Sequence, residues 1–527
     1  MAIFSCSTVI DAFLAVVFLV GLLYLYMTAT HNHWKKKGIP YVKPSMIFGN
    51  LKEYFLREKA LIHIIQDIYN NLDGQRFGGY FEVRSPVLMV KDPDLIERIL
   101  VTDFSCFSDR DIEVDLKREP LASNLFSLKG DIWKNLRNKI TPTFTTRKLK
   151  DMFEQICISG NELIAEIEKS VRKNEAVDAK KLGSCFMTDV IASCAFGLQL
   201  KDDSLEGKQF RDMITELMNP SFFRFIEVSL AVFFDPLAKL LGCRRIPDKV
   251  NDYFINLVKE TMQYREKNNI QRNDFLHNLI NLKMQEDAGL KVHWKQGLDK
   301  EDAYLNQMDD SENIGTKVMT DQCIAAQTLV FLTAGSEAMS AVIAFLFFEL
   351  AYSYDVQRRL QEEVDTVLTK YGGILTYDGI KEMTYLDLVI KERNRKYPES
   401  IFLRRVCNAP YTIPNTDIVL EKGTKIVIPI HAIQHDPTYY PDPDKYDPER
   451  FKDTKQRAGT FLTFGDGPRM CIAMRFVILE IKVAVAMVMS QYSIVLNSKT
   501  QIPFQYDPKA FNVYPSGGIW VNFEKRK

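Results

Sequence analysis

Apolar residues recur every three or four positions along much of this chain, and that spacing predicts α-helices. Residues 149–171 show the spacing clearly, and residues 474–490 repeat it near the carboxyl end. Strand-like stretches are short, and they lie at residues 80–83, 87–90, 412–413 and 425–428. No repeat period is visible, which excludes solenoids and propellers. The pattern predicts a mainly α fold with small β-sheets at one side, an α+β architecture.

Residues 322–352 form the longest apolar stretch with helical spacing. A helix that is apolar nearly all round is either buried or lies in a membrane. The centre of this one carries Gly335, Ser336 and Glu337, and a charged side chain at the middle of a bilayer costs about 3 kcal/mol. We therefore expect the helix to pass through the protein core, with Glu337 facing a cavity.

The amino terminus carries an apolar run at residues 12–27, which Val9 and Ile10 extend to the length of a membrane crossing. Trp34 and the lysines at 35–37 follow the run, so the positive charge comes after it and not before it. This order favours an uncleaved signal-anchor over a cleaved signal peptide. We expect a single membrane span, Trp34 at the headgroup level and the rest of the chain on the cytosolic side.

The rest of the chain shows no clear domain boundary. Residues 31–50 are basic and contain several prolines, which predicts a hinge between the membrane and the globule. Residues 283–317 are polar and weakly periodic, which predicts a surface excursion. The predicted organisation is an anchor at residues 1–30, a hinge at 31–50 and one catalytic domain at 51–527.

Composition narrows the class of protein. The 527 residues include 68 Lys and Arg against 68 Asp and Glu, and 46% are hydrophobic. Zero net charge argues against a general nucleic-acid binder, and the apolar content suffices for a large core. The nine cysteines are scattered, odd in number and without a C-x-x-C pair. They predict neither a disulfide framework nor a structural zinc site, and they favour a reducing compartment.

One cysteine has unusual surroundings. Cys471 follows the glycine-bent stretch FGDGPRM at residues 464–470, which runs into the predicted helix at 474–490. The backbone N–H groups and the dipole of a helix N-terminus favour a thiolate, and so does the nearby charge of Arg469. Such a thiolate is what an axial haem ligand requires, whereas the ordinary alternative is a buried cysteine after a turn.

At this segment the chain resembles the cytochrome P450 superfamily. The family's cysteine signature is F-x-x-G-x-R-x-C, and here it reads Phe464, Gly467, Arg469 and Cys471. The resemblance covers essentially the whole chain, because three more of the family's motifs occur in the right order. They are W-x-x-x-R at Trp133 and Arg137, E-x-x-R at Glu392 and Arg395, and the P-E-R-F segment with Arg450.

The resemblance implies haem b (iron-protoporphyrin IX) as the cofactor. It implies Cys471 as the iron ligand, with Phe464 beside it. Trp133, Arg137 and Arg469 are then expected to bind the two haem propionates through charge-assisted hydrogen bonds.

Three longer sequence stretches point to one group within the family. The stretches GIPYVKP, TPTFTTRKLK and HDPTYYPDP, with the anchor, resemble microsomal insect enzymes that metabolise xenobiotics and allelochemicals, akin to the vertebrate 3A subfamily. The resemblance implies a monooxygenase that inserts one oxygen atom from O2 into apolar small molecules: xenobiotics, plant allelochemicals, insecticides, or endogenous lipids and hormones. It implies electrons from NADPH through NADPH–cytochrome reductase, with cytochrome b5 as a further partner, and a place in the endoplasmic reticulum membrane.

The oxygen-binding helix departs from the family's A-G-x-E/D-T segment. Gly335 and Glu337 are kept, but Ala338 replaces the threonine, whose hydroxyl helps to relay protons. Ser340 lies about 200° further around the helix and cannot substitute for it. We expect Gly335, Glu337 and Ala338 at the catalytic side of this helix.

Three interpretations of Ala338 stay open. The enzyme hydroxylates with a water or a substrate hydroxyl completing the relay, or it hydroxylates poorly and leaks peroxide. Alternatively, it is a haem-thiolate isomerase or dehydratase that needs no reductase. A non-catalytic binder of hydrophobic ligands is the remaining alternative.

Smaller departures concern packing. Ala473 stands where the family prefers glycine, so its methyl is expected to crowd the proximal haem face slightly. Asn394 replaces an apolar residue and destabilises the fold by about 1 kcal/mol unless its amide is hydrogen-bonded. An aromatic cluster belongs either to the core or to a membrane-facing substrate entrance, and it consists of Phe222, Phe223, Phe225, Phe233 and Phe234.

Overall fold

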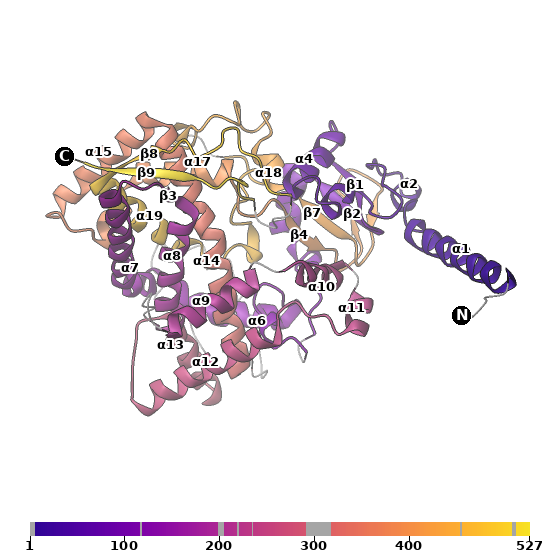
Figure 1. Ribbon diagram of the computed structural model, residues 1–527, viewed down its shortest axis with the longest axis horizontal. Coiled ribbons are helices and arrows are strands. Elements are labelled where there is room, and N and C mark those ends of the chain that lie inside the picture. Colours follow the sequence, from indigo (N-terminus) through magenta and orange to yellow (C-terminus); the bar gives the residue numbers. More distant parts are fainter. Residues whose placement is uncertain are drawn as a thin grey trace.

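A computed structural model describes residues 6–115, 118–198, 205–218, 221–233, 235–290, 318–453, 456–508 and 513–526. The longer helices are α1 (Cys6–Thr28), α4 (Leu61–Asn71), α6 (Gly130–Ile140), α7 (Thr146–Lys173), α8 (Ala179–Ile191), α9 (Leu205–Met218), α10 (Phe222–Phe233), α12 (Asp248–Lys267), α13 (Phe275–Asp287), α14 (Asp321–Tyr352), α15 (Tyr354–Lys370), α17 (Thr384–Lys396) and α19 (Met474–Gln491). The shorter ones are α2 (His33–Lys36), α3 (Lys52–Phe55), α5 (Pro93–Glu97), α11 (Asp235–Leu241), α16 (Tyr377–Glu382) and α18 (Ile430–Gln434). Helices dominate the body in Figure 1, which confirms the predicted mainly α, α+β class.

The strands form three small sheets. The largest has the order β1 (Phe77–Glu82), β2 (Ser85–Val90), β7 (Lys425–Ile428) and β4 (Leu403–Val406), with β2 and β7 parallel. The second has the order β3 (Val177–Asp178), β9 (Trp520–Lys525) and β8 (Tyr492–Leu496), and the third pairs β5 (Tyr411–Thr412) with β6 (Val419–Leu420). Figure 1 shows the first two at opposite ends of the body, so the expectation of sheets at one side is wrong.

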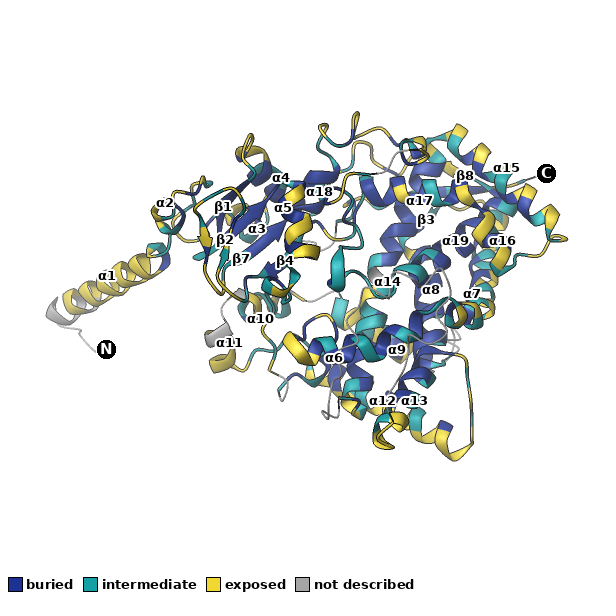
Figure 2. Ribbon diagram, turned by 180° about the vertical axis from the view of Figure 1, so that it is seen from behind, coloured by how far each residue is buried: buried dark blue, intermediate teal, exposed yellow. Residues whose placement is uncertain are grey.

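α14 runs through the core, as the sequence predicts. The Thr320 side chain caps its first turn by accepting a hydrogen bond from the Cys323 N–H at 3.1 Å. α8, α12 and α19 pack against α14, and α8 and α19 are mostly dark blue in Figure 2. α14 is long and apolar enough to cross a membrane, but most of it is covered by protein. The predicted surface excursion begins inside α13, and residues 291–317 lie outside the described residues.

The amino-terminal segment docks onto the large sheet. The described side chains of α1 are exposed as far as Tyr26, and the helix projects from the body at the end where β1 and β2 lie (Figure 1). Trp34 in α2 is fully buried, and its Nε1 donates a hydrogen bond to the Tyr80 carbonyl oxygen at 3.2 Å. The expectation that Trp34 lies among lipid headgroups is therefore wrong, because the ring fills a slot in the protein. Backbone hydrogen bonds extend the contact, from Gly79 N to Pro40 O at 2.8 Å and from Val42 N to Gly79 O at 2.9 Å.

Gly79 forms the floor of the Trp34 slot. A Cβ at this position would lie 2.3 Å from the indole ring, which is closer than any real contact. We expect Gly79→Ala to lower the free energy of unfolding by about 1–3 kcal/mol through overpacking, measured by urea unfolding. In a Trp34→Ala background the methyl has room, so the same substitution should cost little. Equal costs in both backgrounds would contradict the account of the slot.

Candidate functional site

The loop before α19 has a shape that presents Cys471. Gly467 has a φ of 65°, and a Cβ on it would lie 1.9 Å from the Leu100 carbonyl oxygen, so a side chain is excluded there. The Cys471 N–H donates to the Phe464 carbonyl oxygen at 2.8 Å, which closes the loop on itself. Ala473 then begins α19 as its N-cap residue. The Cys471 side chain is half-buried, so part of it is not covered by the protein.

Opposing effects act on the Cys471 thiol. Burial raises its pKa above the ordinary thiol value, while the Ala473 N–H and the guanidinium groups of Arg137 and Arg110 act to lower it. The expected helix-terminus donor is therefore present. The charges that favour the thiolate come from Arg137 and Arg110, whereas the sequence suggested Arg469. A metal cation at the sulfur would deprotonate it outright.

Arg469 connects the cysteine loop to α6 and to the segment that precedes it. Its Nε donates to the Ser108 carbonyl oxygen and its Nη2 to that of Leu128, both at 2.8 Å. Its guanidinium group stacks over the Trp133 ring at 3.8 Å from the centroid. Asp109 lies 3.7 Å from the same guanidinium group and can neutralise only one positive charge.

Two arginines that the sequence did not single out complete a cluster with Arg137 and Arg469. Burial and repulsion from the other three arginines lower the pKa of Arg110 well below its usual range. Burial lowers the pKa of Arg405, on β4, to about 10, and burial and then Arg405 lower that of Arg469 to about 9. Arg405 and Arg469 therefore remain charged at neutral pH.

This arginine cluster fits a ligand with two carboxylates. Buried charge is costly unless an opposite charge pairs with it, and burial lowers the pKa values of Arg110, Arg405 and Arg469, of which Arg469 has Asp109 beside it. Bidentate carboxylate binding is what guanidinium groups do best. Haem b carries two propionates and an iron that binds thiolate sulfur. The arginine cluster fits the propionates, and Cys471 fits the iron.

Glu392, Arg395 and Arg450 form a buried ion-pair triad that supports the loop. Arg395 donates to the two Glu392 oxygens at 2.8 and 2.9 Å, and Arg450 Nε donates to Glu392 Oε1 at 3.0 Å. Arg395 also binds the carbonyl oxygens of Gln434 at 2.8 Å and Pro443 at 2.7 Å. The triad therefore joins α17 to the irregular chain that leads into the cysteine segment.

α14 is buried over most of its length, but its surface is partly exposed near the middle. Ala334 is exposed, and Gly335 and Ala338 are half-buried, between covered stretches on either side. Exposure in the middle of a core helix indicates that it borders a chamber. A Cβ on Gly335 would lie 2.2 Å from Ile191 Cδ1, so this glycine lets α14 and α8 approach each other. The side chain of Glu337 lies outside the described part of the structure.

Ala338 brings only a methyl group to this opening. Ser340 is fully buried against α8, where its carbonyl oxygen lies 3.0 Å from the position a Gly183 Cβ would occupy. It therefore lies in a different environment from Ala338 and does not restore a hydroxyl at that place.

The fold accommodates Asn394 and Ala473, the two residues that depart from the family's usual packing. Asn394 Oδ1 accepts a hydrogen bond from Arg393 Nη1 at 3.1 Å, which offsets the expected cost of burying the amide. Ala473 has a φ of −96°, which any residue adopts, and it packs at the edge of the core.

The fold and this site together define a haem-thiolate protein. The sequence profile described as Cytochrome P450 matches residues 39–521. Probable cytochrome P450 6a14 of Drosophila melanogaster is 35% identical over 96% of this chain and 98% of its own length. Cytochrome P450 6B1 of Papilio polyxenes is 33% identical over 96% and 98%, and cytochrome P450 9e2 of Blattella germanica is 35% identical over 97% of each. The chain belongs to the cytochrome P450 family, and it is a monooxygenase-type oxidoreductase with haem as its cofactor.

Arg405 and Arg404 offer a matched test of the arginine cluster, because adjacent strand residues face opposite sides. The Arg405 charge repels those of Arg110 and Arg469 in the cluster, whereas Arg404 donates to Glu82 at 2.6 Å. We expect Arg405→Gln to speed transfer of haem to an acceptor apoglobin by about tenfold or more, since a hydrogen bond to a charged group contributes about 1.5–3 kcal/mol. Arg404→Gln should lower stability without comparable haem loss. Equal rates in the two variants would contradict the assignment.

Proposed function

We propose that this protein is a membrane-bound monooxygenase that inserts one oxygen atom from O2 into an apolar small molecule. NADPH supplies the electrons through a cytochrome reductase, with cytochrome b5 as a further donor. The observation that carries the proposal is Cys471 beside four arginines in a fold whose central helix opens onto a chamber. The substrate class is xenobiotics, plant allelochemicals, insecticides, or endogenous lipids and hormones, as the resemblance to insect microsomal enzymes implies.

Each part of the site has a distinct task in this proposal. Haem, when bound, supplies the iron at which O2 is activated. Cys471 donates electron density from its sulfur, and the arginine cluster holds the propionates. Trp133 keeps the Arg469 guanidinium group in place by stacking on it. The exposed methyl of Ala334 and the half-buried methyl of Ala338 give the chamber an apolar wall on which a hydrophobic substrate packs.

Ala338 favours a second candidate function. Its methyl group can neither donate nor accept a proton, so Glu337 would have to act through a water or a hydroxyl of the substrate. An isomerase or dehydratase that acts on a peroxide-bearing lipid does not need this proton relay, and it needs neither NADPH nor a reductase. The hydroxylase remains our main proposal because Gly335 and Glu337 keep the family's segment up to the position of the missing hydroxyl.

The surface of the molecule supports a place in the endoplasmic reticulum membrane, with one span and the body on the cytosolic face. α10 and α11 lie toward the end from which α1 projects (Figures 1 and 2). There, Phe223 is 78% and Leu240 82% exposed, which water disfavours and lipid would accommodate. Phe225 turns inward instead and lies under the Arg57 guanidinium group, so Phe225 packs in the core and Phe223 lies on the surface. The other members of the aromatic cluster, Phe222, Phe233 and Phe234, have side chains outside the described part of the structure.

A substrate panel separates the candidate functions. The full-length protein in lipid nanodiscs is mixed with reductase and NADPH, and oxygenated product is scored against NADPH consumed. The proposal predicts product that depends on both additions. Turnover of a peroxide-bearing lipid without either addition, and no oxygenation with them, would favour the isomerase. Spectral shifts on substrate addition with no product at all would favour a ligand binder.

Ala338→Thr tests the missing hydroxyl. We expect peroxide released per NADPH to fall by at least about threefold, since a positioned proton donor typically contributes about 10²–10⁴-fold to a proton-transfer step. Ala338→Val is the matched control, because valine has the shape of threonine without its hydroxyl. Equal leakage in both variants would mean that another group already supplies the protons.

A further inference from the structure

Two histidines lie face to face at the short helix α18. His431 belongs to the helix and His435, four residues on, ends it as the C-cap residue, so one helical turn brings both to the same side. Their ring centroids lie 3.9 Å apart, with an angle of 21° between the ring planes, and both side chains are half-buried. Two imidazole nitrogens that bind one metal ion at about 2.1 Å lie about 3 Å apart, so the separation of these rings suits a shared ion.

Each ring has a nitrogen that binds no protein group within the described part of the structure. His435 Nδ1 lies 2.9 Å from the His431 carbonyl oxygen, which can only accept, so Nδ1 carries the proton and donates it. The lone pair of the neutral ring is then on Nε2. Metal-ligating histidines almost always donate their other N–H in this way, which fixes the ring for the metal. His431 Nδ1 is buried and has no hydrogen-bond partner among the described residues.

Both rings are neutral at physiological pH. Burial, together with repulsion from His435, lowers the pKa of His431 well below its usual value. Burial lowers the pKa of His435 to about 4. Neutral imidazole is the form that binds a metal ion, so protons compete little for these two nitrogens.

The charges near the pair are largely balanced. Arg395 and Lys396 disfavour a cation here, whereas Asp444 favours one. Arg395 is already paired with Glu392, and Lys396 with Glu349, each at 2.8 Å. An ion bound by the two neutral rings would therefore face positive charges that have their own partners.

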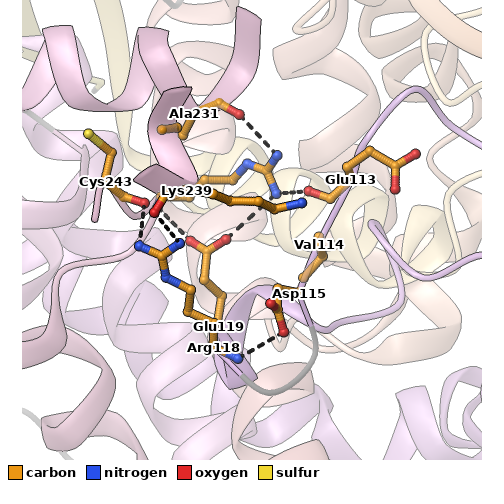
Figure 3. A pocket seen from close by; sticks show the side chains of 10 residues that line it. Glu113, Val114, Asp115, Arg118, Glu119, Ala231, Lys239 and Cys243 are labelled. Carbon is orange, nitrogen blue, oxygen red and sulfur yellow. Dashed lines mark hydrogen bonds and ion pairs between the residues drawn. The ribbon is translucent and has the colours of Figure 1, made fainter. Parts of the chain in front are cut away.

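A polar cavity beside α10 and α11 shows the opposite situation (Figure 3). It measures about 210 Å³ and is lined by charged side chains. Arg118 donates there to the carbonyl oxygens of Lys239 and Cys243, both at 3.5 Å, and the Arg245 N–H donates to Glu119 Oε1 at 2.5 Å. These groups bind one another, so they offer less to a ligand than the two histidines do.

α18 also supports the cysteine loop. Gln434, which lies between the two histidines in sequence, donates through Nε2 to the carbonyl oxygens of Asn394 at 3.1 Å and Arg395 at 2.9 Å. Its Oε1 accepts a hydrogen bond from the Leu462 N–H at 2.9 Å, just before the cysteine loop. An ion that bridges the two histidines would close the turn of α18 that carries this glutamine.

We propose that His431 and His435 form a site for one divalent transition metal ion of the class that imidazole binds, such as Zn²⁺ or Cu²⁺. Among the described residues no group of three His, Cys, Asp or Glu side chains could hold a metal ion, so water completes the coordination of this one. The bound ion restrains α18 and thereby stabilises the loop that carries Cys471. The site needs neither substrate nor electrons, so it stands independently of the proposed function.

Zinc uptake tests the site in the full-length haem-bound protein. Equilibrium dialysis against Zn²⁺, with zinc and haem iron counted by elemental mass spectrometry, should find one zinc ion per iron bound at this pair. In His435→Asn the side chain keeps an N–H donor for the His431 carbonyl oxygen but lacks the Nε2 ligand. We expect the Kd for this ion to rise at least about tenfold, which corresponds to about 1.4 kcal/mol, and His431→Ala should raise it likewise. Excess Mg²⁺, which prefers oxygen ligands, should not displace the zinc.

His63→Ala is the matched control, because His63 of α4 contacts the Tyr506 ring at 5.6 Å and is not a proposed ligand. It should bind zinc as the native protein does. An unchanged Kd in His435→Asn, or an equal loss in His63→Ala, would overturn the site.

Transfer of haem to an acceptor apoglobin tests the link to the cysteine loop. Saturating zinc should slow the transfer about threefold or more in the native protein and not in His435→Asn, because an ion bound only to the folded helix stabilises it. Transfer that zinc leaves unchanged in the native protein would overturn this link. The carbon monoxide spectrum of each variant shows separately whether haem is bound through thiolate, so failure of the metal site and failure of the proposed function remain distinguishable.

Discussion

Positive charge held beside a cysteine sulfur is the constraint on which this molecule depends. Four arginines from four separate parts of the chain converge near Cys471, and burial together with their mutual repulsion lowers the pKa of Arg110 and Arg469. Such an arrangement is unfavourable by itself and becomes favourable when a ligand brings carboxylates. The glycine-bent loop, the stacking of Arg469 on Trp133 and the buried triad around Glu392 all keep this charged site in place.

Much of this site could be predicted from the sequence because it is encoded locally. Cys471, Arg469 and the Trp133–Arg137 pair stand in short motifs, so the resemblance to the family's motifs indicated them. Arg405 stood out in no motif, because it follows another arginine on a strand and only the sheet decides which of the two turns toward the cluster. Arg110 was equally hidden, since it lies in a loop whose path depends on contacts distant in sequence.

The fold shows the same division between local and long-range information. The helical spacing of α7, α14 and α19 predicted those helices nearly to their ends. The prediction for Trp34 was wrong because an aromatic residue after an apolar run is typical of a membrane interface. Nothing in the nearby sequence reveals that Gly79 leaves a slot for the indole ring. The short strand β4 carries two adjacent arginines, which hides the alternation that marks a strand.

In the proposed function, the chemistry depends on α14. Ala338 leaves the proton relay there without its usual hydroxyl, and the fully buried Ser340 lies in a different environment and does not restore it.

The central claim is that the Cys471 sulfur binds haem iron. The most direct measurement is the absorption spectrum of freshly purified full-length protein, reduced with dithionite and exposed to carbon monoxide. The account predicts the red-shifted Soret band of a thiolate ligand, and its loss in Cys471→Ala. An unshifted band in the native protein, or no porphyrin at all with Cys471 intact, would contradict it.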